Sequence, residues 1–373
     1  MNVYDIVIIG GGLAGLTAAL HLSQNNFEVL VIEKQRYPNH KVCGEYLSNE
    51  IKPYLDTLGV ELPNPVSIDT LQFSTREGNQ FIAKLPLGGM GISRYALDKA
   101  LYLTALTNGV EFVFEAVKNV NFANNRFTLT TTSGNKYNSE IVIGAYGKRS
   151  VLDKDLNRKF VGRKSPWLGI KMHYQLKDFP DDLVALHNFK GGYAGLSKTE
   201  TGAINFCYLV NYKSFESYKD IDHFNKNVVS KNPFLAQFLQ NATPIFNKPL
   251  SIAQVSFDQK TTIERHMLMC GDTAGLIHPL CGNGMAMAIH SAKIAAECII
   301  SYLSAVDRSR EALESDYNSI WEATFKRRLA AGRKLQTVLM QPVLAKVLMK
   351  LAVKSPGIVK KVIKSTHGKP ITI

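Results

Sequence analysis

Residues 5–33, DIVIIGGGLAGLTAALHLSQNNFEVLVIE, contain the pattern that decides the fold. Two short β-rich apolar runs, 5–10 and 28–33, flank a stretch of helical composition, 13–24. A strand, a glycine turn, a helix and a second strand within about 30 residues form a βαβ unit. The sequence therefore predicts an α/β fold that contains a Rossmann-type parallel sheet.

The glycine turn has the spacing G-x-G-x-x-G. The first glycine permits the tight turn, the second lets a pyrophosphate approach the backbone, and the third lets helix and strand pack closely. The helix start offers N–H groups to phosphates, and the acid that ends the second strand accepts from a ribose hydroxyl. These features predict a dinucleotide site. The predicted contacts are Gly10, Gly12, Leu13, Ala14, Gly15, Glu33 and Lys34.

A second glycine-rich segment, CGDTAGLIHPLCGNGMAMA at 270–288, lies between an expected strand at 266–271 and an expected helix at 285–304. It resembles the GD motif of the FAD-dependent hydroxylase superfamily, which has the p-hydroxybenzoate hydroxylase fold. The resemblance implies FAD as the cofactor, with Asp272 on the ribityl chain. It places the pyrimidine end of the flavin against Pro279, Gly282, Asn283, Gly284 and Met285. A helix start there would stabilise the negative charge of a reduced flavin.

Two further segments fit this superfamily. Arg94, in a helix expected over 91–107, resembles the arginine near the FAD pyrophosphate or flavin, with Asp98 in its accompanying position. Val117, in FEAVKNV, corresponds to the strand whose backbone receives the adenine. The chain departs from the pattern at Tyr146, because aromatic hydroxylases have Asp before Gly147. That Asp-Gly element is associated with NAD(P)H handling and flavin movement.

Residues 38–48, PNHKVCGEYLS, resemble the P-x-x-K-x-C-G segment of geranylgeranyl reductase-like flavoproteins. Where those reductases carry Y-x-W-x-F-P, this chain keeps Tyr193 but has Gly195 and Ser197 at the later aromatic positions. A halogenase is not expected, because the two tryptophans, Trp167 and Trp321, cannot form a W-x-W-x-I motif.

Four side chains are candidates for the substrate pocket. Cys43 either lies beside the flavin with a redox role or is a small buried apolar residue of the core. Lys171 and His173 share one face of a strand, and His187 lies on the next strand. They line the pocket or form a solvated outer face. For His278 we expect a hydrogen bond that orients the flavin loop rather than acid-base catalysis.

Short alternating runs between 167 and 212 predict an antiparallel sheet, the usual partner of a dinucleotide domain. We predict a discontinuous FAD-binding domain over 1–75, 91–160 and 262–305. A substrate domain takes 76–90 and 161–261, and a basic helical C-terminal region takes 306–373.

The 373 residues are 45% hydrophobic and 20% charged, which is the composition of an ordered globular protein. The five cysteines are odd in number, far apart and without C-x-x-C spacing. This argues against a disulfide scaffold and against a metal site. The apolar N-terminus lacks a basic n-region, so we expect a cytoplasmic protein rather than a secreted one.

The net charge of +13 is concentrated at the C-terminal end. Residues 326–373 hold 12 of the 44 Lys and Arg residues and no Asp or Glu. From 344 to 362 apolar residues follow i, i+3, i+4 spacing, with lysines on another face. The tail lies on an anionic membrane at its inner face, docks an acidic partner such as an acyl carrier protein, or forms a helical lid. Nucleic acid is not an expected partner.

The expected function is that of an FAD-dependent oxidoreductase. Our first hypothesis is an NAD(P)H-dependent monooxygenase that hydroxylates a hydrophobic or aromatic substrate, polyketide-like or carrier-linked. The alternative is a geranylgeranyl reductase-like enzyme that saturates isoprenoid or polyene double bonds. The third hypothesis is a flavin-binding protein without catalytic activity.

Overall fold

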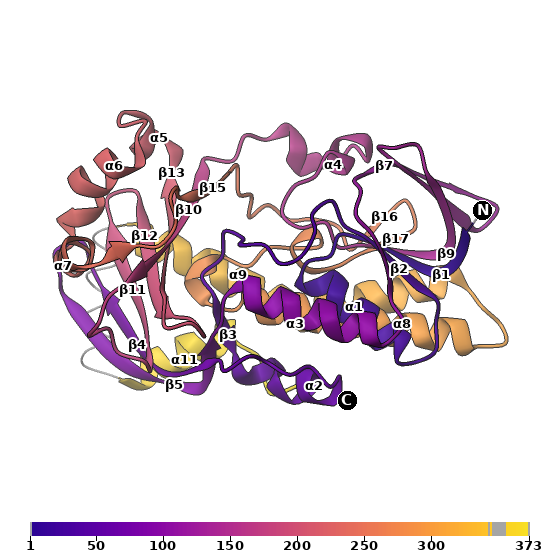
Figure 1. Cartoon of the computed structure of the whole chain (residues 1–373), viewed down its shortest axis with the longest axis horizontal. Helices are drawn as coiled ribbons and strands as arrows, with labels where there is room; N and C mark the ends of the chain where they lie inside the picture. Colours follow the sequence, from indigo (N-terminus) through magenta and orange to yellow (C-terminus); the bar gives the residue numbers. More distant parts are fainter. Residues whose placement is uncertain (1, 342–343, 345–355, 372–373) are drawn as a thin grey trace.

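The computed structural model describes residues 2–341, 344 and 356–371. Two sheets lie at opposite ends of the molecule, and long helices run between and beneath them (Figure 1). This architecture confirms the predicted α/β fold with a second, largely antiparallel sheet and a helical C-terminal region.

The first sheet is built around β1 (Asn2–Ile9), which pairs in parallel with β2 (Val29–Ile32) and β9 (Lys136–Gly144). The sheet order is β16-β17-β9-β1-β2-β6, and β7 and β8 extend it from β9. Those outer strands are β6 (Glu111–Val113), β7 (Val117–Ala123), β8 (Arg126–Thr131), β16 (Ile263–Glu264) and β17 (Met267–Met269).

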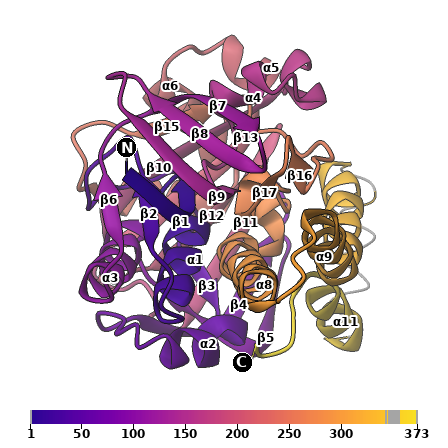
Figure 2. The same cartoon turned by 90° about the vertical axis from the view of Figure 1, so that its right-hand side faces the viewer.

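Helices cover the first sheet and make its central strands inaccessible to solvent. Three of them are α1 (Leu13–Ser23), α3 (Arg94–Thr107) and α8 (Gly284–Ser304), of which α1 contacts both others (Figure 2). Ile6, Val7 and Ile8 are completely buried. This burial explains the unbroken apolar run of β1, because a parallel strand covered on both faces needs no polar alternation.

The second sheet has the order β14-β10-β13-β12-β11-β4-β5-β3, and β15 also pairs with β10. Its pairs are antiparallel except β11 with β4. The strands are β3 (Tyr46–Ser48), β4 (Val66–Ser74), β5 (Gln80–Gly91), β10 (Trp167–Gln175), β11 (Leu183–Phe189), β12 (Gly192–Lys198), β13 (Ile204–Asn211), β14 (Thr243–Pro244) and β15 (Leu250–Ala253).

The membership of this second sheet corrects one predicted boundary. We assigned residues 1–75 to the FAD-binding domain, but β3 and β4 pair with β5 in the second sheet. The boundary is different because β4 and β5 are joined by a short turn and pair as an antiparallel hairpin. The other predicted boundaries stay predictions.

Small helices cover one face of the second sheet. They are α5 (Tyr212–Glu216), α6 (Ile221–Asn227) and α7 (Pro233–Asn241). Phe224 and Leu235 from these helices are completely buried in a core with Phe206 and Tyr208. This packing leaves the opposite face of the sheet to line a cavity. Two further short helices, α2 (Lys52–Thr57) and α4 (Leu152–Asp155), lie elsewhere on the molecule.

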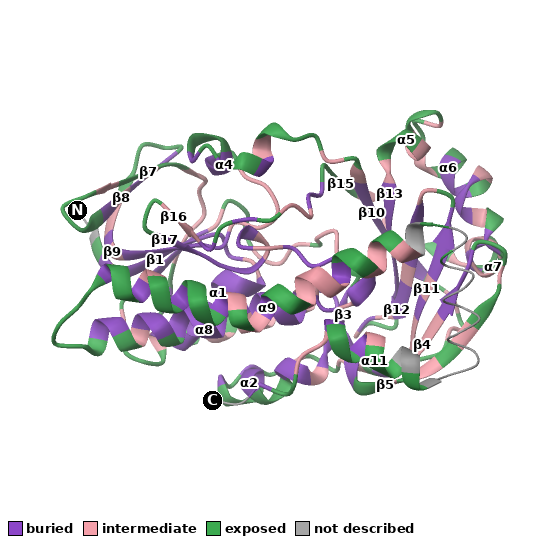
Figure 3. Ribbon diagram, turned by 180° about the vertical axis from the view of Figure 1, so that it is seen from behind, coloured by how far each residue is buried: buried purple, intermediate pink, exposed green. Residues whose placement is uncertain are grey.

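The C-terminal region begins with α9 (Arg310–Met340), which packs on α8. Its buried residues recur every four positions, as a helix face requires: Leu313, Tyr317, Trp321 and Phe325. A further helix, α11 (Pro356–Thr366), lies against β5 (Figure 3).

The described end of the tail is anchored to the body through Glu50. This buried carboxylate accepts hydrogen bonds from the Gly368 N–H and from Arg328 of α9, the latter at 3.2 Å. The Ile371 N–H donates to the Glu50 carbonyl at 2.7 Å. Residues 345–355, most of the amphipathic segment predicted over 344–362, lie outside the described residues.

Among the described residues, α8 alone has the length and hydropathy to cross a membrane, and 67% of its apolar window is buried inside the protein. This helix packs against α1 in the core, and its first turn contains the end of the second glycine motif.

Candidate functional site

A cavity of about 700 Å³ is lined by residues from both parts of the molecule. Its lining divides into two parts. The cofactor half consists of residues that follow strands of the first sheet, together with Arg94 at the start of α3. The chamber consists of largely apolar residues on the second sheet, together with Leu276 and Leu280 from the loop after β17. The cofactor half includes Gly12, Leu13, Ala14, Glu33, Lys34, Arg94, Ala145, Tyr146, Asp272, Pro279, Gly282, Gly284 and Met285. The chamber includes Leu71, Phe73, Phe81, Leu85, Val184, Leu186, Tyr193, Gly195, Leu209, Ile252, Leu276 and Leu280.

The first glycine motif has the geometry that a phosphate cradle needs. Gly10 has φ +100°, and a Cβ there would lie 2.6 Å from the Ala145 carbonyl oxygen. A Cβ on Gly15 would lie only 1.9 Å from the Gly10 carbonyl oxygen, so strand and helix touch through these glycines. Gly12 caps α1 without a side chain over the helix N–H groups. A phosphate group therefore fits at the start of α1.

Glu33 ends β2 beside this cradle, where the sequence places it. Its carboxylate accepts hydrogen bonds from the Gly11 N–H at 2.7 Å and the Gln35 N–H at 3.1 Å. Tyr37, which the sequence reasoning missed, donates its hydroxyl to the Gly11 carbonyl at 2.7 Å. A loop tyrosine four residues after the strand-ending acid was the available signal.

Arg94 and Asp98 form the pair that the superfamily resemblance implies. Two hydrogen bonds of 2.7 and 2.9 Å join the guanidinium to the carboxylate, and Lys41 binds the same carboxylate at 2.8 Å. Burial alone would raise the pKa of Asp98, but Arg94 and Lys41 together lower it below its ordinary value. The cavity therefore has a fixed cationic group on the Arg94 side.

The second glycine motif forms the opposite wall of the cofactor half. Asp272 lies in the cavity lining, in a short 3-10 turn after β17. Its carbonyl accepts from Lys260 at 2.7 Å, and Lys260 also donates to the Lys148 carbonyl at 3.0 Å. Burial lowers the pKa of Lys260 to about 8. Lys260, another residue that sequence reasoning missed, thus joins two cavity loops.

The helix start that follows has one predicted contact with a different role. Gly282, at φ +63°, lines the cavity with Gly284 and Met285. Asn283 is completely buried, and its side-chain amide donates to the Thr366 carbonyl at 2.8 Å. Its side chain therefore binds the C-terminal segment, and its predicted contact with the cofactor stays a prediction.

Two other sequence interpretations have structural outcomes. The N-cap interaction of His278 confirms the loop-orienting hydrogen bond, because its Nδ1 accepts the Leu280 N–H at 3.3 Å. Burial lowers the pKa of His278 to about 3. Val117 begins β7 and packs on the first core, outside the described lining of the cavity. Its proposed adenine contact stays a prediction.

The four candidates for the substrate pocket lie in different places. Cys43 lines the cavity, whereas Lys171, His173 and His187 lie outside its described lining. His187 binds the Ser74 hydroxyl at 2.8 Å and stacks on Phe234, so it stabilises the second sheet. The alternative of a solvated face is also wrong, because all three are at most 4% exposed.

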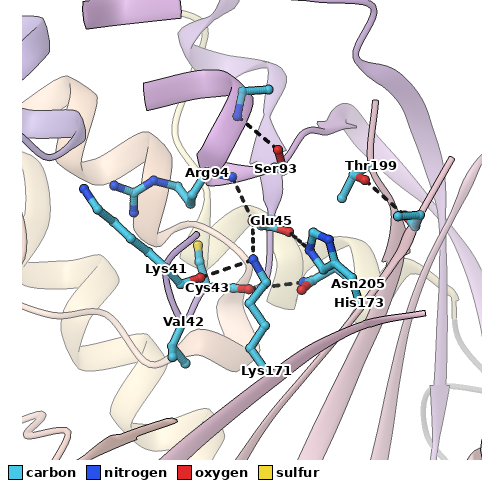
Figure 4. Close-up of polar contacts among 12 residues, drawn as sticks. Lys41, Val42, Cys43, Glu45, Ser93, Arg94, Lys171, His173, Thr199 and Asn205 are labelled. Carbon is cyan, nitrogen blue, oxygen red and sulfur yellow. Dashed lines mark hydrogen bonds and ion pairs between the residues drawn. The ribbon is translucent and has the colours of Figure 1, made fainter. Parts of the chain in front are cut away.

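Lys171 and His173 instead converge on Glu45, which the sequence reasoning passed over (Figure 4). The completely buried Glu45 carboxylate accepts from Lys171, from His173 Nε2 at 2.7 Å and from the Arg94 N–H at 2.7 Å. Glu45 also belongs to the cavity lining. Its position two residues after Cys43 was the signal in the sequence.

The same contacts fix the loop that carries Cys43. Lys171 donates to the Lys41 carbonyl at 3.2 Å, and Asn205 donates to the Cys43 carbonyl at 3.1 Å (Figure 4). Hydrogen bonds from the second sheet therefore hold this loop in place at the wall of the cavity.

Glu45 and His173 also lie near His40, and their potential metal-ligand atoms all lie within 4.8 Å of one another. The Glu45 carboxylate is, however, already occupied by three donors, one of them the ammonium of Lys171. A cation at this point would face that ammonium, so the donor set does not fit a metal ion.

The chamber is closed by the C-terminal region. Leu335 of α9 and the residues Val362, Ile363 and Thr366 of α11 line it. Ile363 is buried against Phe81 and Leu85 of β5. The tail therefore contributes a wall to the cavity, which agrees with the lid interpretation of its described part.

Residues 4–159 match a family model described as pyridine nucleotide-disulphide oxidoreductase. The match covers β1, β2, the first glycine motif and Glu33. The second glycine motif, outside the match, completes the cofactor half. The chain is an FAD-dependent oxidoreductase. All five cysteines of this oxidoreductase are free in the structure.

Sequence relatives of this FAD-dependent oxidoreductase are distant but cover most of the chain. Conditioned medium factor receptor 1 of Dictyostelium discoideum is 22% identical over 87% of this chain and 68% of its own length. Digeranylgeranylglycerophospholipid reductase of Methanococcus aeolicus is 25% identical over 91% of this chain and 87% of its own length.

Solved structures share its fold. The flavin-dependent brominase Bmp2 superposes with a TM-score of 0.81 at 17% identity, covering 98% of this chain and 93% of its own. PqsL of Pseudomonas aeruginosa, a probable FAD-dependent monooxygenase, gives 0.74 at 16% identity, covering 92% and 98%. These neighbours show that the oxidoreductase has the fold that the GD motif implied.

Proposed function

We propose that this oxidoreductase is a monooxygenase that hydroxylates a large hydrophobic or aromatic substrate, with NAD(P)H as the electron donor. The observation that carries the proposal is the continuity of the cavity. The cofactor half opens directly onto a chamber whose walls are leucine, phenylalanine and valine side chains. Such a chamber favours an apolar substrate and keeps water from the reacting atoms.

FAD, when bound, supplies hydride acceptance and the activation of oxygen. The chain would bind and orient it: the start of α1 would hold the phosphates, and Asp272 would accept from a ribityl hydroxyl. The start of α8 at Gly284 favours negative charge at the pyrimidine end. Ile363 and its neighbours on α11 exclude water from the chamber.

Two comparisons support different reaction types. PqsL, the probable monooxygenase, and the flavin-dependent brominase share this fold and favour a reaction with oxygen. The archaeal relative named as a lipid reductase favours the second candidate, saturation of isoprenoid double bonds. At Gly195 the chamber lacks the aromatic side chain that the reductase motif would provide, which favours the monooxygenase.

The deciding experiment measures oxygen and NAD(P)H together while a panel of long-chain alkylphenols and polyprenols is added to the holoenzyme. A monooxygenase consumes one oxygen molecule per NAD(P)H and gives a product heavier by one oxygen atom. Saturation of a double bond under anaerobic conditions would overturn the proposal in favour of the reductase. Flavin reduction that no substrate stimulates would favour the flavin-binding protein without activity.

We also propose that the tail docks on an anionic membrane at the inner face. Lys360, Lys361 and Lys364 are exposed on α11, whose Ile363 lines the chamber. Lysines near an anionic surface contribute about 1 kcal/mol each before salt screening. The triple Lys→Gln variant should therefore lose most of its binding to phosphatidylserine vesicles at low salt while it retains FAD. Vesicle binding that equals the wild type would contradict this surface, and selective binding to an acidic carrier protein would favour that partner instead.

A further inference from the structure

Glu45 is held in an unusual backbone conformation for an acidic side chain. Its φ is +54°, in the left-handed region where a side chain costs about 1 kcal/mol or more. The Arg94 N–H, Lys171 and His173 all bind its carboxylate and maintain this conformation. Backbone strain that several contacts enforce is typical of functional positions.

From Glu45 a chain of imidazoles leads to the surface. His173, which is 4% exposed, contacts Glu45 through Nε2, and its ring centroid lies 5.2 Å from that of His40. His40 is exposed to solvent. One nitrogen or oxygen atom from each of the three residues lies within 4.8 Å of the other two, a separation that one bridging water can span.

The surroundings keep this chain ready to exchange protons. Lys171 and Glu45 face His173 from β10 and from the Cys43 loop, while Glu200 approaches His40 from the β12–β13 turn. Tyr95 stacks on His40, and Phe246 stacks on His173 while its ring is tilted against that of His40. Burial, Lys171 and His173 lower the pKa of His40 below its ordinary value, and the charges of Glu45 and Glu200 oppose this shift.

We propose that His40, His173 and Glu45 form a proton route from solvent into the flavin cavity. A proton enters at His40 and passes to a ring nitrogen of His173. The proton on His173 Nε2 then moves to the Glu45 carboxylate, in the cavity lining. The route rests on the proposed function in taking bound FAD as the redox centre and NAD(P)H as the donor. NAD(P)H delivers a hydride, which carries its own proton, and either reaction type takes up one further solvent proton per turnover: hydroxylation releases water, and saturation adds a hydride and a proton to the double bond.

The test reduces the holoenzyme with reduced methyl viologen, a donor that carries electrons but no proton. Two viologen radicals and one proton convert the bound oxidised flavin to its reduced anion. Flavin absorbance measures the reduction, and a pH-indicator dye measures the proton uptake. His40→Ala should slow proton uptake about a hundredfold, which is the lower end of a general acid-base contribution. External imidazole should restore the rate, because His40 is exposed. His173→Gln should slow it without rescue.

Matched controls separate a proton route from a structural role. His223→Ala removes another exposed histidine, and His187→Gln removes another buried histidine of the second sheet. Neither should change proton uptake. In the holoenzyme, His40→Ala should also change the ¹⁵N chemical shifts of the His173 ring in NMR spectra, a readout that needs no turnover.

Three results would overturn the proposal. One is unchanged proton uptake in His40→Ala, and another is a slow variant that imidazole does not restore. The third is stoichiometric Zn²⁺ binding to the wild type that His40→Ala abolishes, which would make the cluster a metal site. Viologen reduction needs neither oxygen nor substrate, so these outcomes are independent of whether the enzyme is a monooxygenase.

Discussion

Two glycines in the two halves of the site tolerate a side chain very differently. At Gly15, behind the cofactor half, a Cβ would lie 1.9 Å from a backbone oxygen. At Gly195, in the chamber, it would lie 3.5 Å from the nearest atom, the Cδ2 of Leu186, which is ordinary contact. Backbone sterics therefore exclude a side chain at Gly15, whereas Gly195 has room for a methyl group. The first kind of constraint limits which residues are possible; the second leaves room for changes in specificity.

The strongest test of this contrast is Gly15→Ala. The added methyl group cannot avoid the Gly10 carbonyl unless α1 moves from β1, so we expect a loss of about 3 kcal/mol in the free energy of unfolding. The phosphate cradle would move with the helix, and FAD should be lost. Urea denaturation and the flavin content of the purified protein measure both effects. Gly162→Ala, where a Cβ meets nothing within 4 Å, is the control. Retention of full stability and FAD by Gly15→Ala would remove the steric argument.

Asp272→Ala tests the opposite wall of the cofactor half with a smaller expected effect. A lost hydrogen bond to a charged acceptor weakens binding by about 2 kcal/mol, roughly 30-fold in the Kd for FAD. Flavin fluorescence during titration of the apoprotein measures the Kd. Asp307→Ala, at an exposed loop position, should leave it unchanged. A wild-type affinity in Asp272→Ala would show that this carboxylate does not touch FAD.

The same contrast explains what the sequence could predict. The turn at Gly10, Gly12 and Gly15 and the acid at Glu33 follow from local backbone requirements, and such requirements leave a local pattern. Arg94 and Asp98 are four residues apart on one helix, so their pairing is also local.

Glu45 shows why the remaining residues were not predicted. Its partners Lys171 and His173 are more than 120 positions away in the chain, and only the pairing of β10 with β13 brings them together with the Cys43 loop. No sequence period encodes such a distance. His187 was misassigned for a related reason. Alternation along a strand gives two faces, but it does not tell which face meets the cavity and which meets α7.

Acid should weaken the second sheet through His187. Burial lowers its pKa to about 4, whereas the unfolded chain has the ordinary value of 6.5. Between these values the unfolded state binds the proton and the folded state does not. The stabilising contribution is therefore complete above pH 6.5 and declines as the pH falls toward 4.

From pH 6.5 to 5.5 this decline amounts to about 1 kcal/mol for one histidine. His187→Gln keeps a polar group for Ser74 but does not titrate. Between pH 6.5 and 5.5 the variant should therefore lose about 1 kcal/mol less of its free energy of unfolding than the wild type loses. Urea denaturation at the two pH values measures the difference. Equal pH dependence in the two proteins would show that the pKa of His187 is the same in the folded and unfolded states.

The smallest expected effect is that of Gly195→Ala, and it completes the contrast with Gly15. Because the new Cβ makes only ordinary contacts with Leu186 and the Cys207 carbonyl, the free energy of unfolding should change by less than about 0.5 kcal/mol. The Kd for FAD should not change. Gly195→Phe places a ring in the chamber itself, so it should retain FAD but shorten the longest n-alcohol that quenches flavin fluorescence. If Gly195→Phe binds long alcohols as the wild type does, apolar ligands do not enter the chamber at Gly195. If Gly195→Ala alone releases FAD, the two halves of the cavity are not independent, and the division between a backbone-defined cofactor half and a side-chain-defined chamber fails.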